Sequence, residues 1–506
     1  MTLATVHSRA QLGVDAPNVT VECHLSNGLP GFTIVGMPEA SVRESKDRVR
    51  SALINSHFEF PQKRITINLA PADLPKEGAR FDLAIAVSIL AASEQVPNER
   101  LQDYEFLGEL ALNGDLRGVS GSIPATVAAN KADRHLIIAK TNENEVSLCA
   151  EGAAKCAANL LQVCADLHGR ESLPRAQGQS FCDADYTMDM ADVVGQESAK
   201  RALEIAASGA HNVLLFGSPG TGKSMLAGRL ASVLPPLEHQ QALEVASINS
   251  LKPSEQRQAP SLQRPFRSPH HSASAPALVG GGSQPRPGEI SLAHRGVLFL
   301  DELPEFKRSV LEVLREPMES GQICISRAKA QVNFPARFQL IAAMNPCPCG
   351  HFGDGSQRCT CSPGRILAYK DKISGPLLDR IDLQVQVDRL AIEQFHQEPR
   401  QKAERSHHIR LRVERSRQRQ LARQDCSNAE LQGEALRTHC KLGQNEQSLL
   451  AKAMEKLQLS PRAYDRILRV ARSIADLDKR SEINSTDLSE ALGYRNFDRF
   501  YSRLNG

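Results

Sequence analysis

Several features are missing from this sequence, and most of these absences exclude a class of protein. Tryptophan is absent, which says nothing about function, and no apolar run is as long as the roughly 18 residues that a membrane-spanning helix needs. The first residues lack the apolar core of a signal peptide. The 12 cysteines are scattered apart from one group of four, unlike a secreted disulfide framework. We therefore expect a cytoplasmic protein with no membrane partner.

A strong net charge is also missing. Lys and Arg together number 61, and Asp and Glu number 58, which gives a formal net charge of +3 over 506 residues. This balance neither requires nor excludes nucleic acid as a partner, so any basic surface has to be local. The chain is too long for one hydrophobic core, and its length indicates about three domains.

The pattern of apolar residues changes along the chain. Residues 1–172 mix alternating strands with apolar helices, which predicts an α+β domain, and residues 173–189 are rich in turn-forming residues and predict a linker. Residues 190–389 alternate short strands with helices, as in a doubly wound α/β core. Residues 390–506 are polar and rich in predicted helix, so the sequence indicates an α/β protein with a helical C-terminal region.

Alternation predicts two early strands in the first region. Val19, Val21, Cys23 and Leu25 alternate with polar residues, and the apolar residues of 32–35 follow an Asn-Gly turn at 27–28. Two such runs on either side of a turn are typical of a pair of neighbouring strands. We therefore expect these two strands to pair with each other.

A glycine-rich motif follows the apolar run 213–216. It fits the pattern G-x-x-x-x-G-K-[ST], and residues 225–234 after it predict a helix, which is the context that this phosphate-binding loop (P-loop) requires. Backbone N–H groups would surround the phosphates of ATP, Lys223 would add a positive charge, and Ser224 would supply an oxygen to Mg²⁺. The residues expected to contact the nucleotide are Gly217, Ser218, Pro219, Gly220, Thr221, Gly222, Lys223 and Ser224.

Two further predicted strands end in polar side chains. Residues 296–300 lead into Asp301 and Glu302, and we expect this strand to lie beside the strand that leads into the P-loop. Asp301 would hold Mg²⁺, and Glu302 would polarise the attacking water. Residues 340–344 lead into Asn345, which could bond that water or the γ-phosphate from a place between the P-loop and the acids. The alternative for the acid pair is a strand that ends in two solvated carboxylates.

The spacing of these strands and polar ends resembles the AAA+ ATPases, and within them the magnesium-chelatase-like clade. The segments 33–45 and 288–294, together with the cysteine group, are similar to the YifB/ComM family over essentially the whole chain. This resemblance implies an N-terminal domain like the Lon proteolytic domain, an AAA+ core and a helical lid. It also implies a homo-oligomer, expected to be a hexamer, that drives DNA branch migration in recombination and natural transformation, with recombination proteins as possible partners.

The resemblance also assigns two arginines. Arg380, which follows a short predicted helix, matches an arginine finger that acts on the nucleotide of a neighbouring subunit. Arg462, in Ser460-Pro461-Arg462, matches the sensor-2 arginine. The alternatives are that Arg380 only pairs with Asp379 or Asp382, and that Arg462 is a surface charge in the first turn of a helix.

In the Lon-like region, the residues needed for peptidase chemistry are absent. Residues 75–82 resemble the Lon serine motif, but Arg80 stands where Lon has its nucleophile, and the position of its catalytic lysine falls at Ile123. Serine–lysine catalysis needs a hydroxyl and a nearby base. We therefore expect a structural or DNA-guiding element without peptidase activity.

Four cysteines form the pattern C-x-C-x₉-C-x-C just after Asn345. The residues between them include Gly, Asp, Ser, Gln and Pro, which predicts a loop, and four thiolates are the ligand set of structural Zn²⁺ sites. His351 could replace one ligand, and the alternative is a loop with four reduced thiols. The expected ligands are Cys347, Cys349, Cys359 and Cys361.

Three segments could contact DNA. Residues 322–334 predict a hairpin in which Ile323 and Ile325 face Val332 and Phe334, and its tip carries Arg327 and Lys329 for sequence-independent phosphate contacts. A solvated turn is the alternative.

The other two segments flank this hairpin in the sequence. Residues 400–423 contain nine Lys or Arg and two Asp or Glu, which fits either DNA contact or a solvated lid helix. Residues 266–288 resemble the helix-2 insertion of the clade, which we expect to be mobile and to face the pore.

Two other functions remain open. The first is a magnesium-chelatase motor subunit, although such subunits generally lack a Lon-like first domain. The second is a nucleotide-gated scaffold that does not hydrolyse ATP, against which the set Asp301, Glu302, Asn345 and Arg380 argues. DNA-stimulated ATPase activity would separate the three.

Overall fold

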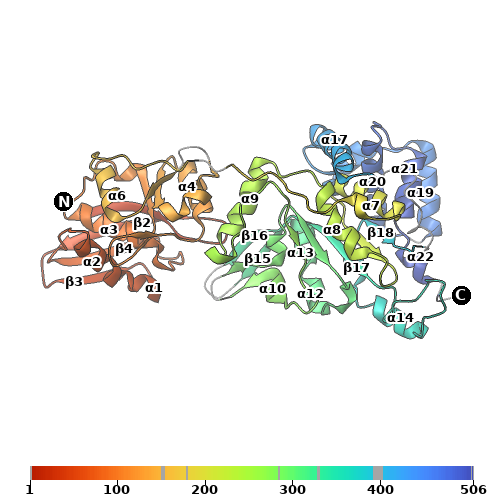
Figure 1. Cartoon of the computed structure of the whole chain (residues 1–506), viewed down its shortest axis with the longest axis horizontal. Coiled ribbons are helices and arrows are strands. Elements are labelled where there is room, and N and C mark those ends of the chain that lie inside the picture. Colours follow the sequence, from red (N-terminus) through yellow and green to blue (C-terminus); the bar gives the residue numbers. More distant parts are fainter. Residues whose placement is uncertain are drawn as a thin grey trace.

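The computed structural model shows an elongated chain with a mixed sheet and a parallel sheet at different places along it (Figure 1). It describes residues 3–149, 154–177, 180–282, 285–326, 331–390, 403–457, 459–502 and 504, with only the backbone of 254 and 498. The N-terminal part lies at one end, a parallel sheet lies in the middle, and the C-terminal helices lie at the other end. Among the described residues no helix is long and apolar enough to cross a membrane.

A seven-stranded mixed sheet organises the N-terminal part, in the order β3-β4-β2-β1-β5-β8-β9. Pairing is antiparallel for β1–β2 and β2–β4 and parallel for the other neighbours. The strands are β1 (Leu3–Arg9), β2 (Asn18–Ser26), β3 (Gly31–Val35), β4 (Arg64–Ala70), β5 (Tyr104–Leu107), β8 (His135–Ala139) and β9 (Ala154–Ala157). The expected pairing of the two early strands is therefore wrong, because β4 lies between β2 and β3.

Helices pack on this sheet, and α3 is buried along its whole length. Its sequence is almost entirely apolar, so all of its faces can be covered by β1, β2 and the neighbouring helices. The remaining elements of this part are α1 (Ala40–Arg43), α2 (Ser45–Asn55), α3 (Asp82–Ala92), β6 (Glu109–Leu110), β7 (Leu116–Arg117), α4 (Ser122–Lys131), α5 (Glu143–Val146) and α6 (Leu160–Leu167).

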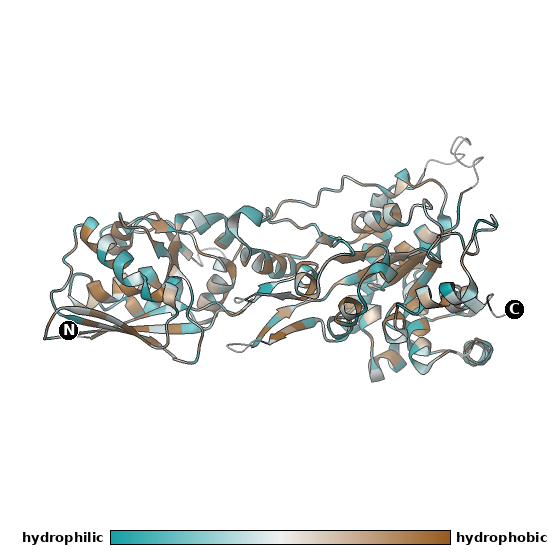
Figure 2. Cartoon of the chain, turned by 90° about the horizontal axis from the view of Figure 1, so that it is seen from below, coloured by the Kyte–Doolittle hydropathy of each residue, from teal (hydrophilic) through white to brown (hydrophobic). Residues whose placement is uncertain are grey.

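The core contains a five-stranded parallel sheet in the order β11-β14-β17-β10-β18. Its central strands are buried on both faces, which explains their continuous apolar sequences, and Figure 2 shows them in brown. The expectation that the strand before Asp301 lies beside the strand before the P-loop is wrong, because β17 separates them. The strands are β10 (Val213–Phe216), β11 (Phe266–Arg267), β14 (Val297–Leu300), β17 (Gln339–Met344) and β18 (Leu383–Gln386).

Helices and two short ribbons surround the core sheet. The antiparallel ribbon of β15 (Gln322–Ser326) and β16 (Gln331–Pro335) has the register that the sequence predicts, with Ile323 opposite Phe334 and Ile325 opposite Val332. The other elements are α7 (Glu197–Gly209), α8 (Lys223–Val233), α9 (His239–Ser250), α10 (Ala275–Val279), β12 (Gly280–Gly281), β13 (Arg286–Pro287), α11 (Glu289–Leu292), α12 (Arg308–Glu312), α13 (Arg315–Ser320), α14 (Pro363–Lys370) and α15 (Gly375–Leu378).

The C-terminal region is helical, as expected. Ser460 caps α20 by accepting a hydrogen bond from the backbone N–H of Ala463, and Pro461 occupies the first turn, where its missing N–H costs nothing. The helices are α17 (Ser406–Gln424), α18 (Gly433–His439), α19 (Gln444–Lys456), α20 (Pro461–Leu477), α21 (Ser485–Gly493) and α22 (Phe497–Ser502).

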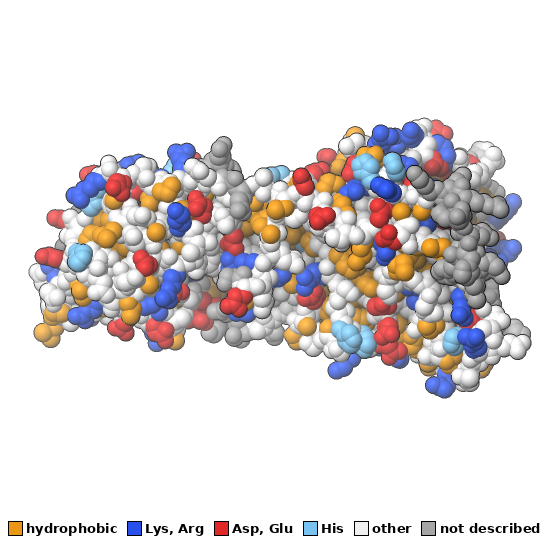
Figure 3. Space-filling model, viewed as in Figure 1, with side chains coloured by type: hydrophobic (Ala, Val, Ile, Leu, Met, Phe, Trp, Pro, Cys, Tyr) orange, Lys and Arg blue, Asp and Glu red, His pale blue; other side chains and the backbone are white. Residues whose placement is uncertain are grey.

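The N-terminal part joins the core through α4 and α9. The backbone N–H of Gly121 donates to the carbonyl of Ser250 at 3.0 Å, and Arg257 forms an ion pair with Glu145. A small apolar cluster fills the junction and consists of Ile123, Leu148, Cys149, Phe181, Leu237, Ala242 and Ala246. In the space-filling view, basic and acidic side chains are interspersed over the visible face (Figure 3), in keeping with the small net charge.

Candidate nucleotide-binding site

The P-loop connects β10 to α8 and holds the ammonium group of Lys223 inside its turn. Lys223 Nζ donates to the carbonyl oxygens of Gly217 at 2.7 Å and Ser218 at 2.8 Å, and to Asn345 Oδ1 at 3.1 Å. Burial lowers the pKa of Lys223 to about 8, although the nearby carboxylate of Asp301 acts in the opposite direction. The loop therefore places a positive charge where phosphate oxygens would lie.

Glycine is required at several points of this loop. A Cβ atom on Gly217 would lie 2.2 Å from the carbonyl oxygen of Val387 on the neighbouring chain segment. Gly222, which precedes α8, has a φ of +90°, a conformation that other residues adopt at a cost. These constraints explain why the motif contains glycines at fixed positions, since they let the backbone close around an anion.

Asp301 lies directly against the first turn of α8. Ser224 Oγ donates a hydrogen bond to Asp301 Oδ2 at 2.6 Å, and Asp301 Oδ1 accepts one from the backbone N–H of Glu302 at 2.9 Å. The hydroxyl and carboxylate oxygens are the hard ligands that Mg²⁺ prefers. The pair that the sequence assigns to Mg²⁺ is therefore in contact, although the two residues are 77 positions apart.

Glu302 has a neighbour that the sequence did not assign. Its backbone has a φ of +51°, and its Oε2 lies 3.2 Å from Nδ1 of His271, on the segment after β11. His270 and His271 belong to residues 266–288, which the sequence predicts to be a mobile insertion rather than part of the site. No local sequence pattern indicates that His271 lies near Glu302. The parallel pairing of β11 with β14 brings this segment beside the end of the strand that carries Asp301 and Glu302.

Asn345 occupies the position expected from the sequence. It follows β17, which lies between β10 and β14, so its side chain stands between the P-loop and the acid pair. The order of these strands differs from the one expected, yet the result for Asn345 is the same, because the carboxyl ends of all three parallel strands meet at one edge of the sheet.

Arg380 and Arg462 lie at the opposite edge of this sheet. Both line a cavity of about 810 Å³ whose wall includes Asn212, Gly296 and Gln339, at the starts of β10, β14 and β17. The P-loop, Asp301 and Asn345 follow the ends of the same strands. The fold therefore does not bring the two arginines to the P-loop of their own chain.

Arg380 contacts Glu319 and Pro376 and is not paired with Asp382. Its guanidinium forms an ion pair with Glu319 and donates from Nη1 to the carbonyl of Pro376 at 2.6 Å. Asp382 instead pairs with Arg466 at 2.6 Å. Arg462 is exposed in the first turn of α20 and lies on the rim of the same cavity.

Most described arginines of the basic segment face the protein. Five arginines of α17 contact groups on the core or on neighbouring helices, through carboxylates, backbone carbonyls or an aromatic ring. These are Arg410 over Tyr186, Arg412 with Glu204 and Glu404, Arg417 with the carbonyls of Ala207 and Ser208, Arg419 with the carbonyl of Asp476, and Arg423 with Asp476. The interpretation of this segment as a purely solvated helix is therefore wrong. Its many arginines reflect the packing of α17 onto α7 and α20.

The tip of the β15–β16 hairpin, including Arg327 and Lys329, lies outside the described residues. The strands that carry it are present with the expected facing pairs. The DNA contact assigned to the tip remains a prediction.

Arg80 and Ile123, which the resemblance to Lon places at its catalytic positions, are both buried. Arg80 is buried, at 7% exposure, and donates from Nη1 to Gln11 Oε1 at 2.8 Å. Ile123 is buried in the apolar cluster that joins α4 to α9. The absence of peptidase activity stays a prediction.

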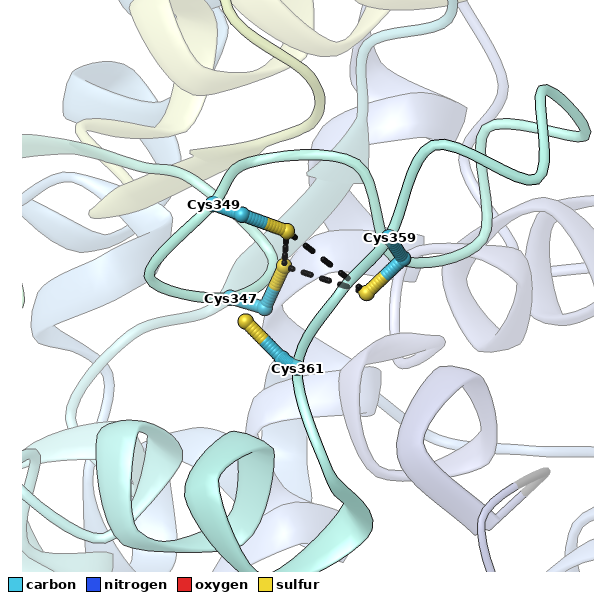
Figure 4. A group of neighbouring side chains, drawn as sticks. All are labelled: Cys347, Cys349, Cys359 and Cys361. Atoms are coloured by element: carbon cyan, nitrogen blue, oxygen red, sulfur yellow. Dashed lines mark hydrogen bonds between the residues drawn. The ribbon is translucent and has the colours of Figure 1, made fainter.

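The four cysteines after Asn345 come together, with one ligand atom from each within 4.8 Å of the others. They come from the two ends of the loop between β17 and α14 (Figure 4). His351 is not part of this group, and its Nδ1 lies 3.0 Å from Asp354 Oδ2.

Family models match three stretches of the chain. Residues 189–395 match a model described as magnesium chelatase, subunit ChlI. Residues 21–142 match one described as subunit ChlI of Mg-chelatase, and residues 403–495 match the C-terminal model of the same subunit.

Individual relatives match over very different lengths. The chain is 52% identical to competence protein ComM of Haemophilus influenzae, over all of both chains, and 51% identical to YifB of Escherichia coli K12, over all of this chain and 99% of that protein. The magnesium-chelatase 38 kDa subunit of Cereibacter sphaeroides is 29% identical over 29% of this chain and 49% of its own.

Proposed function

Because the chain belongs to the YifB/ComM family of magnesium-chelatase-like ATPases, we propose that it is an AAA+ motor that hydrolyses ATP to drive branch migration of DNA. The role proposed is in homologous recombination and in the integration of DNA during natural transformation. The observation that carries the motor is the assembled site, in which Lys223, Ser224, Asp301, Glu302 and Asn345 meet at one edge of the sheet. The identity with a protein named for competence supports the DNA role.

The residues of the site divide the work of hydrolysis. Lys223 and the N–H groups of the P-loop bind the phosphates, and Ser224 and Asp301 would hold Mg²⁺, which neutralises phosphate charge. Glu302 orients and polarises the attacking water. Asn345 accepts a hydrogen bond from Lys223 and so holds this side chain near the place of the γ-phosphate. His271 lies 3.2 Å from Glu302 and helps to fix the direction of its carboxylate.

A neighbouring subunit would complete this site. Arg380 and Arg462 lie at the edge of the sheet opposite their own P-loop, which supports a role at a nucleotide held by an adjacent copy. A guanidinium supplied in this way stabilises the charge of the transition state. We propose a closed ring, a hexamer by family resemblance, in which every interface contains one nucleotide.

DNA would pass the β15–β16 hairpin, whose tip carries Arg327 and Lys329 in the sequence. The basic helix α17 is the weaker candidate, since most of its described arginines are engaged within the chain. The N-terminal part is proposed to have a Lon-like fold without peptidase activity. Its contacts with α9 and the hairpin region, including Gly13 against Val332, suit a structural or DNA-guiding role.

The magnesium-chelatase subunit is the less supported alternative. The first domain does not by itself separate the two functions, because residues 21–142 match a model that is named after that subunit. The extent of similarity does favour the DNA motor: a chelatase subunit matches 29% of this chain, whereas ComM matches all of it.

ATPase activity with and without DNA tests the proposal. We expect turnover to rise when single-stranded or branched DNA of any sequence is added, and to stay unchanged when porphyrin is added instead. A scaffold would bind ATP without turnover under either condition. Turnover that ignores DNA would contradict the proposed function.

A further inference from the structure

The loop between β17 and α14 gathers four sulfur atoms around one point. The Sγ–Sγ distances are 3.3 Å for Cys347–Cys349, 3.8 Å for Cys347–Cys359 and 3.6 Å for Cys349–Cys359, and Cys361 completes the group (Figure 4). A tetrahedral Zn²⁺ site with Zn–S bonds of about 2.3 Å has S–S edges of about 3.8 Å. The four thiols therefore already approach the spacing of such a site, and none of them forms a disulfide.

The loop has little else to give it a fixed shape. Residues 345–362 contain no helix or strand, and apart from the cysteines their one large apolar side chain is that of Phe352. Loops of this length without regular structure are uncommon in compact domains unless something orders them. Cys347 is fully buried whereas the other three cysteines are half-buried, so a bound ion would tie the half-buried cysteines to the core.

One side of the loop rests against the P-loop. Gly350 has a φ of +82°, and a Cβ atom added there would lie 2.5 Å from Cγ of Pro219. The loop also starts directly after Asn345, which accepts a hydrogen bond from Lys223. The part of the loop around Gly350 therefore packs against Pro219 on the outer side of the P-loop.

The other side of the loop holds the last helix, α22. Tyr501 donates from its hydroxyl to the carbonyl of Pro346 at 2.8 Å. The ring of Phe352 stacks with that of Tyr501 and meets that of Phe500 edge-on at 5.3 Å. Phe500 lies 5.3 Å from Phe216, at the end of β10. The helix α22 therefore contacts both the loop, through Phe352, and the strand that leads into the P-loop, through Phe216.

We propose that Cys347, Cys349, Cys359 and Cys361 bind one structural Zn²⁺, and that the metal-closed loop fixes the P-loop against α22. The sulfur ligands fill all four positions of a tetrahedral ion, which makes the site structural. Loss of the metal would free the half-buried cysteines of the loop, and Pro219 and Phe500 would no longer be supported by it. The effect on nucleotide rests on the proposed ATP site, whereas the metal binding does not.

Metal analysis of the purified full-length chain is the first test. We expect about one Zn²⁺ per chain in the wild type and in Cys182→Ser/Cys426→Ser, which removes two cysteines outside the group, and none in Cys347→Ser/Cys359→Ser. Lys223→Ala should keep its zinc while losing ATP, which separates metal binding from nucleotide binding. Negligible zinc in the wild type, or equal zinc in both cysteine variants, overturns the proposal.

The second test uses the wild type alone, so that it does not depend on the folding of a variant. A mercurial reagent releases thiolate-bound zinc, and a colorimetric chelator counts it while a fluorescent ATP analogue reports affinity. We expect the affinity for the ATP analogue to weaken several-fold in proportion to the zinc that is released. Affinity that stays constant after complete release overturns the coupling to the P-loop, and four cysteines found as disulfides in the untreated protein overturn the metal site.

Discussion

Arg380 and Arg462 line the same cavity, at the edge of the core sheet where the strands begin, whereas the P-loop lies where they end. Arg380 is also held in place, by its ion pair with Glu319 and its bond to the carbonyl of Pro376. An arginine at this edge is not brought to the nucleotide site of its own chain, and a head-to-tail ring joins different surfaces of neighbouring subunits. The proposal therefore places both arginines at an interface between subunits.

Subunit mixing tests this assignment. Arg380→Ala should bind ATP but not hydrolyse it as a homo-oligomer, and mixing with Glu302→Gln subunits should restore part of the turnover. At some mixed interfaces an intact Arg380 then faces an intact Glu302. The control is Arg380→Ala/Glu302→Gln, which should rescue nothing. Absence of rescue at every ratio, in rings shown to exchange labelled subunits, would exclude a role in trans.

Substitutions at Lys223 and at Glu302 should affect different steps, nucleotide binding and hydrolysis. Lys223→Ala removes the charge in the P-loop and should abolish binding of a fluorescent ATP analogue. Glu302→Gln should keep binding and lower turnover by about 10²- to 10⁴-fold, because only the polarisation of water is removed. Glu305→Gln is the matched control, since Glu305 pairs with Lys372 at 3.5 Å, outside the site. Near-normal turnover in Glu302→Gln would remove Glu302 from the catalytic role.

Asp382 is expected to hold the C-terminal helices on the core. Burial alone would raise the pKa of Asp382, but Arg466, His211 and the N–H of Asn212 outweigh burial and hold that pKa well below its usual range. A carboxylate with a depressed pKa stabilises the fold above the pKa of the unfolded state, about 4, and loses this contribution as pH falls.

Replacing this carboxylate should therefore destabilise the protein at neutral pH. We expect Asp382→Asn to lower stability by about 3 kcal/mol at pH 7, since it leaves Arg466 without its partner, and the deficit to shrink only as pH falls below about 4, toward the lowered pKa of Asp382. Thermal unfolding at pH 7 and at several pH values below 4 measures it, with the exposed Asp371→Asn as the control. Equal midpoints for Asp382→Asn and wild type at pH 7 would contradict the assigned role.

The hairpin prediction concerns binding rather than turnover. Arg327→Glu/Lys329→Glu should weaken binding to all DNA sequences alike and flatten its salt dependence, by about one unit of log–log slope for each phosphate that is no longer neutralised. Basal ATPase should survive, while DNA stimulation falls. Arg415→Glu, an exposed position on α17, should leave both unchanged. The opposite result, with only Arg415→Glu affected, would move the DNA-binding role to the basic helix.

The sequence predicted the parts of the site that are local. A P-loop is contiguous, so the strand, the glycines and Lys223 could all be located from eight residues and their flanks. The β15–β16 register followed from alternation alone. The position of Asn345 was also correct, because every strand of a parallel sheet ends at the same edge, whatever the order of the strands.

What the sequence could not supply was the order of strands and the direction of side chains. The place of β17 between β14 and β10, and of β4 between β2 and β3, depends on long-range pairing that no local pattern encodes. The contact of His271 with Glu302 depends on the pairing of β11 with β14 in the same way. The charge count of residues 400–423 could not reveal that Arg417 donates to two backbone carbonyls of α7.

The most direct measurement of the central claim is ATP-dependent branch migration on a synthetic four-way junction with movable arms. We predict that the wild type converts the junction into two duplexes only when ATP is hydrolysed, and that Lys223→Ala and Glu302→Gln leave it intact. A wild-type protein that hydrolyses ATP in the presence of the junction, yet leaves its branch point unmoved at every protein concentration, would contradict the proposed function.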